Sequence, residues 1–268
     1  MANFRDKIVV ITGGSDGIGK ALVGQFLALG AKVATCGRNA DKLELLKSQY
    51  PSQELFTMQL DVTNQGQDEA FIKAVEEKWG SIDILINNAG ISMRALVSEV
   101  SIETLKNVMD INFWGTVYTT KAALPAIQKS NGVIVGVSSI AGYRGLPGRS
   151  GYSASKYALN GWLEALRTEL YGSGTHVMWV CPGFTSSNIR NAALNKDAKA
   201  QGESPMDEGA MMSSEECAAH IIKAIAKRKR TLVLTFTGKR TVFMNKYFPA
   251  WADKLAHQFF FKNGILIK

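Results

Sequence analysis

The sequence contains little cysteine, and its cysteines are not arranged in pairs. Only three occur among 268 residues, Cys36, Cys181 and Cys217, and their spacing matches neither a metal-binding motif nor a disulfide framework. We therefore expect all three to be buried thiols in a reducing compartment, with no metal site. Proline is also scarce, with six residues, while 46% of the residues are hydrophobic. This composition excludes a disordered chain and predicts a globular protein with a large core.

Long apolar runs are missing as well. The N-terminus passes from a short polar stretch directly into the strand-like run IVVIT, which is too short for the apolar region of a secretory signal. No stretch approaches the roughly eighteen apolar residues that a membrane-spanning helix needs. These absences predict a cytoplasmic protein without a spanning segment.

Acidic residues are nearly absent from the C-terminal part of the chain. Residues 221–268 contain 11 Lys and Arg but only one acid, Asp253, whereas residues 1–220 contain 20 basic and 22 acidic residues. The formal net charge of +8 therefore comes entirely from the C-terminal segment. No recognised nucleic-acid-binding module accompanies this charge, so we do not expect nucleic acid as a partner.

Strand and helix patterns alternate regularly along the chain. Apolar, β-branched runs predict buried strands at residues 7–12, 32–36, 54–60, 82–87, 132–138, 176–181 and 231–235. Helical periodicity predicts helices at residues 17–29, 41–50, 67–79, 101–128, 152–172 and 214–227. This alternation predicts an α/β protein with a parallel sheet covered by helices on both faces. Because no linker, repeat or low-complexity tract is visible, we expect one domain.

A glycine-rich turn, TGGSDGIG at residues 12–19, joins the first strand to the first helix. Its glycines Gly13, Gly17 and Gly19 would let backbone amides approach a pyrophosphate, and the helix N-terminus would favour the negative charge. Glycines at a strand-to-helix junction also serve ordinary turns, so a nucleotide site and a simple turn are both open from this motif alone.

The end of the second strand is where a dinucleotide site reads the adenosine ribose. Gly37 and Arg38 stand there without a carboxylate. An acid would bind a free 2′-hydroxyl, whereas an arginine pairs with a 2′-phosphate, so the sequence favours NADP over NAD. A solvated arginine on a turn is the alternative, and Asp16 in the glycine turn weakens the preference.

Small and polar residues follow the next two strands. Asp61 and Val62 come after the third strand, and the run NNAG at residues 87–90 comes after the fourth. Ligands of open α/β sheets bind at the carboxyl edge of the strands, although NNAG also suits an ordinary turn. Asn112 lies inside the helix predicted at residues 101–128, where an asparagine is usually only tolerated.

The stretch from Ser139 to Lys156 carries the clearest chemical pattern. Tyr152 and Lys156 are four residues apart and share one face of a predicted helix. A cation beside a phenol lowers the phenol pKa from about 10, so the hydroxyl can exchange a proton with a carbonyl or alcohol oxygen. For this pair alone, an exposed tyrosine beside a solvated lysine is an equal alternative.

Taken together and in this order, these motifs resemble the short-chain dehydrogenase/reductase family. The matching features are the glycine turn, NNAG, Asn112, Ser139, Tyr152 with Lys156, and Pro182-Gly183 after the sixth strand. The resemblance covers about residues 5–235. It implies a doubly wound, seven-stranded parallel sheet of Rossmann type, and hydride transfer between a nicotinamide and a carbonyl or alcohol.

The resemblance also implies a role for each matching residue. Tyr152 would be the general acid/base, Lys156 would lower its pKa and hold the nicotinamide ribose, and Ser139 would hydrogen-bond the substrate oxygen. Asn112 would hold a water that links Lys156 to solvent. The implied cofactor contacts are Gly13, Ser15, Gly17, Ile18, Gly19, Arg38, Asp61, Val62, Asn88, Ala89, Gly90, Tyr152, Lys156, Pro182, Gly183, Thr185 and Ser187. Ser187 stands where the family often has a threonine.

Substrate specificity in this fold lies in loops, here residues 91–97, 140–150 and 184–213. Their apolar residues suggest a pocket for a lipophilic ketone or alcohol, or alternatively pack the loops against the body; they are Met93, Leu96, Tyr143, Leu146, Phe184, Met211 and Met212. Four arginines accompany them, Arg94, Arg144, Arg149 and Arg190. The polar, small-residue segment 184–213 predicts a mobile lid over the ligand.

The chain continues beyond the last strand as a basic, aromatic extension, residues 239–268, of the catalytic domain 1–238. Pro249 suits the first position of a helix, on which Trp251, Leu255 and Phe259 form an apolar stripe. Such a helix fits a peripheral membrane contact, packing on a partner subunit, or a roof over the substrate site. The extension loosely resembles membrane-associated hydroxysteroid dehydrogenase-like and 3-ketodihydrosphingosine reductase-like branches.

The sequence therefore predicts an NADP(H)-dependent oxidoreductase acting on a ketone or secondary alcohol of steroid, sphingoid or fatty type. A non-catalytic dinucleotide-binding sensor or scaffold on the same fold is the alternative, and the intact catalytic residues argue against it. The family also implies a dimer or tetramer formed through the helices at residues 101–128 and 152–172.

Overall fold

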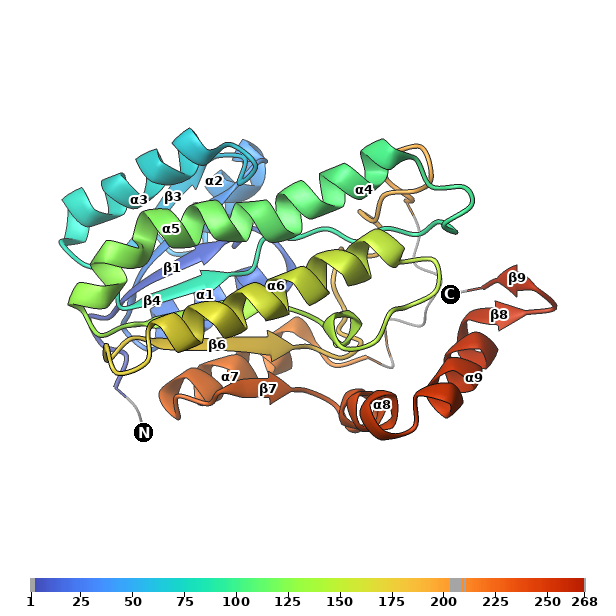
Figure 1. The fold of residues 1–268 in the computed structure, drawn as a ribbon. Coiled ribbons are helices and arrows are strands. Elements are labelled where there is room, and N and C mark those ends of the chain that lie inside the picture. Colours follow the sequence, from blue (N-terminus) through green and yellow to red (C-terminus); the bar gives the residue numbers. More distant parts are fainter. Residues whose placement is uncertain (1–2, 203–208, 210, 268) are drawn as a thin grey trace.

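The computed structural model describes residues 3–202, 209 and 211–267. Seven parallel strands form one sheet in the order β3-β2-β1-β4-β5-β6-β7 (Figure 1). The strands are β1 Ile8–Thr12, β2 Lys32–Gly37, β3 Leu55–Gln59, β4 Ile84–Asn87, β5 Val133–Val137, β6 His176–Cys181 and β7 Thr231–Val233. The predicted doubly wound, seven-stranded parallel sheet is confirmed. The order reverses between β1 and β4, where ligands of such sheets bind.

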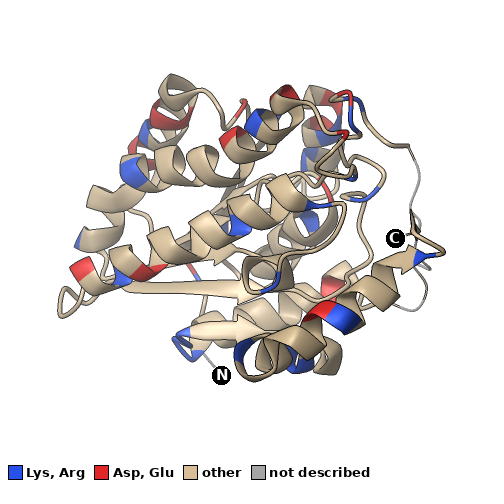
Figure 2. Cartoon of the chain, turned by 45° about the vertical axis from the view of Figure 1, so that its right-hand side comes forward, with Lys and Arg blue, Asp and Glu red and all other residues tan. Residues whose placement is uncertain are grey.

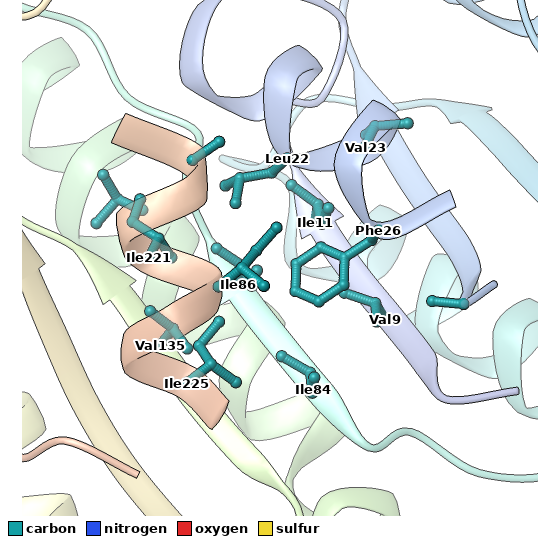
Figure 3. Close-up of a cluster of buried hydrophobic side chains, with 14 of the residues drawn as sticks. Val9, Ile11, Leu22, Val23, Phe26, Ile84, Ile86, Val135, Ile221 and Ile225 are labelled. Carbon is teal, nitrogen blue, oxygen red and sulfur yellow. The ribbon is translucent and has the colours of Figure 1, made fainter. Parts of the chain in front are cut away.

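Helices cover both faces of this sheet. One face carries α1 Gly17–Ala28, α2 Ala40–Ser48 and α7 Ser214–Ala226, and the other carries α3 Gln65–Trp79, α5 Gly115–Lys129 and α6 Ser150–Glu169. Figure 3 shows the first interface, where Phe26 of α1 and Ile221 of α7 pack on sheet residues such as Ile86. Burying each such side chain contributes about 1.5–3 kcal/mol. The strands read as continuous apolar runs because both of their faces are buried.

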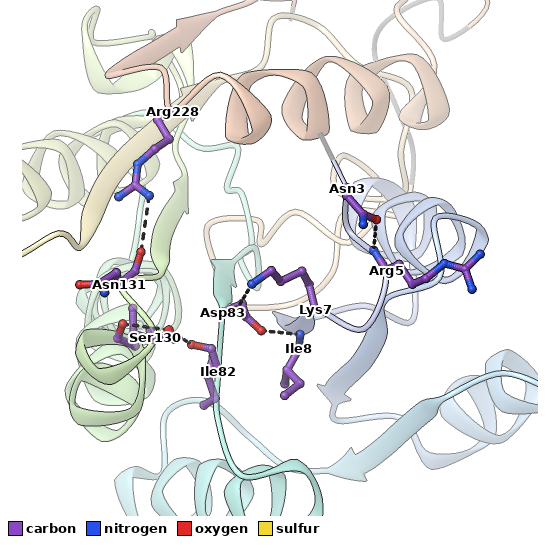
Figure 4. A network of polar contacts seen from close by, with 10 residues as sticks. Asn3, Arg5, Lys7, Ile8, Ile82, Asp83, Ser130, Asn131 and Arg228 are labelled. Atoms are coloured by element: carbon purple, nitrogen blue, oxygen red, sulfur yellow. Dashed lines mark hydrogen bonds and ion pairs between the residues drawn. The ribbon is translucent and has the colours of Figure 1, made fainter. Parts of the chain in front are cut away.

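The amino edge of the sheet is held by polar contacts at the start of the two central strands (Figure 4). Asp83 Oδ1 pairs with Lys7 Nζ at 2.7 Å, and Asp83 Oδ2 accepts a hydrogen bond from Ile8 N at 2.9 Å. Ser130 Oγ donates to Ile82 O at 2.6 Å. These contacts align β1 with β4 at the amino edge, so that both strands end together at the edge where the turns carry functional residues.

The prediction of one continuous helix at residues 101–128 is wrong, because a π-helical turn interrupts it. The structure has α4 Ile102–Met109, then a π-helical turn Asp110–Trp114, then α5. A π-helical turn contains an extra residue, which rotates the following helix and is frequent at functional sites. Here it holds Asn112, which is fully buried. The amide of Asn112 finds all of its hydrogen bonds in neighbouring segments, and these long-range bonds stabilise the widened turn.

The C-terminal extension lies beyond the carboxyl ends of β6 and β7 (Figure 1). It consists of α8 Phe236–Tyr247, α9 Pro249–Phe260 and a short hairpin, β8 Phe261–Lys262 with β9 Ile265–Leu266. Pro249 opens α9 as predicted. The sequence did not indicate α8, which crosses the boundary expected after residue 238; Asn245 Nδ2 ties it to the body by donating to Tyr143 O at 2.7 Å. The division into residues 1–238 and 239–268 stays a prediction.

Two features of the fold concern the predictions about cysteine and membrane spans. All three cysteines are free and buried, as predicted, and burial raises the pKa of each thiol to about 12. Within the described ranges, none of the helices combines the length and the apolarity that crossing a bilayer would take.

Candidate active site

A cavity of about 690 Å³ opens at the carboxyl edge of the sheet. Its wall contains the glycine turn at one end, Ser139, Tyr152 and Lys156 in the middle, and residues of α8 and α9 beyond them. The predicted site residues line it, with two exceptions: Gly19 and Asn112. Those two lie directly behind the wall and support it. The tertiary structure thus brings motifs spread over residues 12–187 into one cavity.

The glycine turn is shaped by close backbone packing. Gly13 and Gly17 have φ of +69° and +50°, a region that glycine adopts without strain. A Cβ on Gly19 would lie 2.2 Å from Gly13 O, so a larger residue would not fit. Asn88 Nδ2 donates to Thr12 O at 3.0 Å and Gly13 O at 3.2 Å, which fastens the turn to the end of β4. This glycine cradle at the start of α1 fits the pyrophosphate of a dinucleotide.

The far end of the cavity, beside β2, is lined by Ser15, Asp16, Arg38 and Lys42. Asp16 caps α1 by accepting from Gly17 N at 2.8 Å, and its other oxygen lies 2.5 Å from Lys42 Nζ. The carboxylate that weakened the case for NADP is therefore paired with a cation. Sequence reasoning missed Lys42, although its position in the first turn of the helix after Arg38 would have indicated it.

Tyr152 and Lys156 lie on one face of α6, as predicted, and both are buried. Lys156 Nζ donates to Val137 O at 2.9 Å and lies 5.7 Å from the centre of the Tyr152 ring. Burial lowers the pKa of Lys156 to about 8. The four-residue spacing therefore places the amine of Lys156 next to the ring of Tyr152.

Opposing influences act on the pKa of Tyr152, and the predicted lowering of this pKa by Lys156 stays a prediction. Burial raises the pKa of Tyr152 above its ordinary value of 10, and the opposing contributions come from a hydrogen bond with Ser139 and the charge of Arg149. Lys156 points at the Val137 carbonyl, and burial favours the neutral form of its amine. The sequence did not single out Arg149 as a neighbour of the catalytic tyrosine.

Ser139 and Asn112 are positioned by main-chain groups. Ser139 caps the short 3-10 turn Ile140–Gly142 and accepts from Ala141 N at 3.1 Å. Asn112 Oδ1 accepts from Ile91 N at 2.8 Å, while Nδ2 donates to Ile91 O and Ser155 Oγ, each at 2.9 Å. Asn112 therefore holds the segment after NNAG against α6. Its predicted role in holding a water stays a prediction.

Gly90 fills the narrow space between Asn112 and Lys156. A Cβ at this position would lie 3.0 Å from Asn112 Oδ1 and 3.5 Å from Lys156 Nζ. Any larger side chain would push apart the two groups that border the catalytic residues. The last glycine of NNAG thus serves close packing at the site as well as a turn.

The substrate end of the cavity is lined by apolar side chains from distant segments. Leu146 and Phe184 come from the predicted loops, and Leu255 and Phe259 come from α9. The rings of Phe184 and Phe259 stack with their centres 6.0 Å apart. Two of the three stripe residues of α9 therefore face the cavity, while Trp251 is 69% exposed.

Other residues of the predicted loops serve packing instead. Met93 is fully buried in a small core, where its sulfur accepts from Gly151 N at 3.2 Å. Tyr143 accepts from Trp179 Nε1 at 3.0 Å and does not line the cavity. Within the predicted lid, residues 203–208 and 210 lie outside the described residues. Its described part pairs with residues 92–94 through Leu194, and its mobility stays a prediction.

Comparisons with known proteins agree with this geometry. A sequence model of the short chain dehydrogenase family matches residues 7–198. Dehydrogenase/reductase SDR family member 7B of Mus musculus is 34% identical over 256 residues, which covers 92% of this chain and 79% of the relative.

Two solved structures share the fold. A short chain dehydrogenase/reductase from Burkholderia phymatum, in complex with NAD, superposes with a TM-score of 0.84 at 23% identity and covers 94% of this chain and 96% of its own. An alcohol dehydrogenase from Thermococcus sibiricus, complexed with 5-hydroxy-NADP, gives 0.73 at 24% identity and covers 86% and 96%. With the family match over most of the chain, these findings show that the protein belongs to the short-chain dehydrogenase/reductase family, whose members are oxidoreductases that use a nicotinamide dinucleotide.

Proposed function

We propose that this protein transfers a hydride between NADP(H) and a lipophilic ketone or secondary alcohol. The observation that carries the proposal is the meeting of Ser139, Tyr152 and Lys156 in one cavity with the glycine turn at its other end. The bound nicotinamide would supply or accept the hydride. The protein's own groups would handle the oxygen and the proton.

In carbonyl reduction, negative charge develops on the substrate oxygen. The hydroxyls of Ser139 and Tyr152, which both line the cavity, would face this oxygen and stabilise its charge. Tyr152 would then donate its proton to the oxygen, and Lys156, four residues along α6, would bind the nicotinamide ribose. Tyr152 and Lys156 are both buried, and the exclusion of water strengthens these interactions.

The choice of NADP rests on the charges beside β2. Arg38 and Lys42 line the cavity there, and no acidic residue follows β2 directly. Asp16 is paired with Lys42. The 2′-phosphate of NADP would meet two cations at this end of the cavity. The free 2′-hydroxyl of NAD would find no unpaired carboxylate to accept its hydrogen bond.

Turnover distinguishes an enzyme from a non-catalytic dinucleotide sensor on this fold. NADPH consumption should be followed with a panel of steroid, long-chain and short-chain ketones. We expect the long-chain or steroid ketones to be reduced, because Leu146, Leu255 and Phe259 make that end of the cavity apolar. Tight NADPH binding without reduction of any ketone, unchanged by Tyr152→Phe, would instead support the sensor.

The exposed face of α8 and α9 supports a peripheral membrane contact, which we propose alongside the catalytic function. Phe243, Tyr247, Phe248 and Trp251 are exposed and form a continuous aromatic patch, with ring centres 4.9–6.2 Å apart between neighbours. Figure 2 shows basic positions on these two helices, and Lys246 Nζ lies 5.2 Å from the centre of the Tyr247 ring. The lysines and arginines of α8 and α9 are Lys239, Arg240, Lys246 and Lys254. Aromatic rings flanked by cations suit the surface of an anionic bilayer.

Vesicle flotation tests this contact with full-length protein. We expect binding to phosphatidylserine-containing vesicles, reduced by the double change Phe248→Ser and Trp251→Ser and by high salt. Tyr171→Ser, at an exposed tyrosine outside the patch, is the matched control. Absence of wild-type binding would overturn the membrane contact. A dimer that dissociates in the double variant would instead assign the patch to a second copy of the chain. The family's dimer or tetramer through α4, α5 and α6 remains a separate prediction.

A further inference from the structure

Arg149 is a buried cation in the wall of the catalytic cavity. It directly precedes α6, three residues before Tyr152, and its side chain lines the cavity while only 8% exposed. Among the described residues, no hydrogen bond or ion pair engages its guanidinium, and its Nε is buried without a partner. A buried guanidinium without a carboxylate is costly, because burial removes its hydration.

Arg38 and Arg240 also line the cavity but are exposed to solvent, whereas its remaining cations apart from Arg149 are held by the protein itself. Arg144 pairs with Asp253, Lys42 pairs with Asp16, and Lys156 donates to the Val137 carbonyl. Arg190 donates from Nη2 to Thr185 O at 2.6 Å. Arg149 therefore differs from its neighbours in having its charge directed at the cavity instead of at a protein acceptor.

The cavity offers Arg149 no acid of its own. Only two acidic residues line the wall in the part of the chain that the structure describes, Asp16 and Asp61. Asp16 belongs to the glycine turn and is paired, and Asp61 follows β3 and accepts from Thr63 N at 3.0 Å. Both lie toward the β2–β3 end, so the catalytic end of the cavity is positively charged.

The main chain holds Arg149 firmly in this position. Arg149 N donates to Leu146 O at 3.0 Å, and Arg149 O accepts from Ser153 N at 2.8 Å. The preceding Gly148 has φ of +71°, and Leu266 of the C-terminal hairpin packs against it. These contacts fix the backbone from which the side chain enters the cavity wall. A guanidinium presents a planar pair of donors that matches a carboxylate or a phosphate.

We propose that Arg149 binds an anionic group of the substrate, a carboxylate or a phosphate monoester, so that the substrate is an amphiphilic ketone. Its anionic head lies at Arg149, its ketone lies at Tyr152 and Ser139, and its apolar chain lies against Leu255 and Phe259 of α9. This rests on the proposed function for the ketone chemistry, whereas the anion site can be tested by binding alone.

The test measures the affinity of three eight-carbon probes for full-length protein saturated with NADP⁺, by calorimetry. The probes are octyl phosphate, octanoate and octanol. We expect one or both anions to bind at least about 10-fold more tightly than octanol, since a hydrogen bond to a charged group is worth about that much. The stronger of the two anions identifies phosphate or carboxylate as the recognised group. Equal affinity for all three probes in the wild-type protein overturns the inference.

Two variants assign the anion site to Arg149. Arg149→Gln should lower the affinity for the anion by about 10- to 100-fold and the affinity for octanol by much less, whereas Arg149→Lys should retain part of the anion affinity. NADP⁺ affinity and the melting temperature of each variant report on folding. Arg149 is not the anion site if Arg149→Gln binds the anion as tightly as the wild type does. The same conclusion follows if the variant's affinity falls equally for all three probes.

Kinetic measurements distinguish an anion site at Arg149 from an alternative in which the charge of Arg149 shifts the pKa of Tyr152. The comparison uses a long-chain 4-oxo acid and its methyl ester. An anion site predicts that Arg149→Gln lowers kcat/KM for the acid more than for the ester, mainly through KM. Equal losses for both substrates with a shifted pH profile would overturn the proposal in favour of tuning. Failure to reduce any ketone would refute the proposed function but leave the binding result intact.

Discussion

Arg144 Nη1 lies 2.7 Å from Asp253 Oδ1 and thereby joins the loop after β5 to α9. The same nitrogen lies 3.0 Å from Asn245 Oδ1 of α8. Asp253 is the only acid in residues 221–268, so the one negative charge of the basic extension attaches it to the loop that follows Ser139. The wall of the substrate end is therefore held by a contact between segments 109 residues apart.

Breaking this contact should loosen α9 without unfolding the protein. Asp253 is 70% exposed, so Asp253→Asn should change the free energy of unfolding by less than about 1 kcal/mol. We expect KM for a long-chain ketone to rise several-fold while kcat changes little, because Leu255 and Phe259 would be held less firmly. Steady-state kinetics and chemical denaturation measure the two effects.

Glu77→Gln is the matched control for Asp253→Asn. It removes an exposed carboxylate from the Lys73–Glu77 pair on α3, which does not line the cavity. The two variants should have similar stability and differ in KM. An unchanged KM in Asp253→Asn would mean that the ion pair does not support the cavity wall.

Removing the phenolic hydroxyl tests Tyr152 as the proton donor. Tyr152→Phe should lower kcat by about 100- to 10,000-fold, the usual contribution of a general acid. The Kd for NADPH should stay within about threefold, since the ring and its packing are kept. Tyr171→Phe, at a highly exposed tyrosine, should keep wild-type activity. A fall of less than tenfold in Tyr152→Phe would point to a different acid.

The two cations beside β2 predict the cofactor preference. Arg38→Ala should weaken NADPH binding about 10-fold or more and leave NADH binding nearly unchanged, because only NADPH carries the 2′-phosphate. Lys42→Ala should have a larger effect, since it also leaves the carboxylate of Asp16 without its partner at 2.5 Å. Fluorescence titration with both cofactors measures the affinities.

Lys47→Ala supplies the control for these charge changes. Lys47 lies in the last turn of the same helix, α2, and does not line the cavity. Its removal should affect neither cofactor. Equal affinity of the wild type for NADPH and NADH, maintained in Arg38→Ala, would contradict the assignment of NADP.

A buried acid that does not line the cavity, Asp68, predicts a pH dependence of stability. Burial raises the pKa of Asp68 from its ordinary value of 3.8 to about 7, even though Thr119 Oγ1 donates to its Oδ1 at 2.7 Å. Above pH 7 the carboxylate is ionised in both states, so the cost of burying its charge is fully present. As the pH falls from 7 toward 4 the folded protein binds the proton first, and this cost disappears.

Asp68→Asn should therefore be more stable than the wild type at pH 8, by on the order of a few kcal/mol, with the difference closing near pH 4. Urea denaturation at both pH values measures it. Asp41→Asn, at an exposed aspartate in the first turn of α2, controls for the loss of a charge near a helix terminus. A difference that does not vary with pH would show that Asp68 is not the group responsible.

Much of the fold and the catalytic core was predictable because the relevant signals are local. Strand runs such as IVVIT reflect burial on both faces, and the alternation of strands with helices leaves few possible topologies. The spacing of Tyr152 and Lys156 on one helix and the glycines after β1 depend on backbone geometry over a few residues. Family resemblance then connected these local motifs into one expected site.

The prediction of one continuous helix through Asn112 failed because it concerned a group whose surroundings depend on distant segments. Ile91 and Ser155 satisfy the amide of Asn112 in the π-helical turn, and neither neighbour is visible from the helical pattern. The direction of the Tyr152 pKa depends on burial, which no spacing reports. The sequence left two alternatives open for Met93 and Tyr143, and the fold decided between them by packing both within the body.

The sequence by itself determined the doubly wound sheet and the glycine turn after β1, since each follows from short-range periodicity or spacing. The candidate catalytic residues came from the family resemblance, and their roles stay predictions. Only the tertiary structure decided which charges are paired and which face the cavity. Asp16 is paired with Lys42, Arg144 is bound by Asp253, and Arg149 lines the cavity without a protein partner for its Nε. Pairing and desolvation depend on distances between segments far apart in the chain, and those distances exist only in the folded protein.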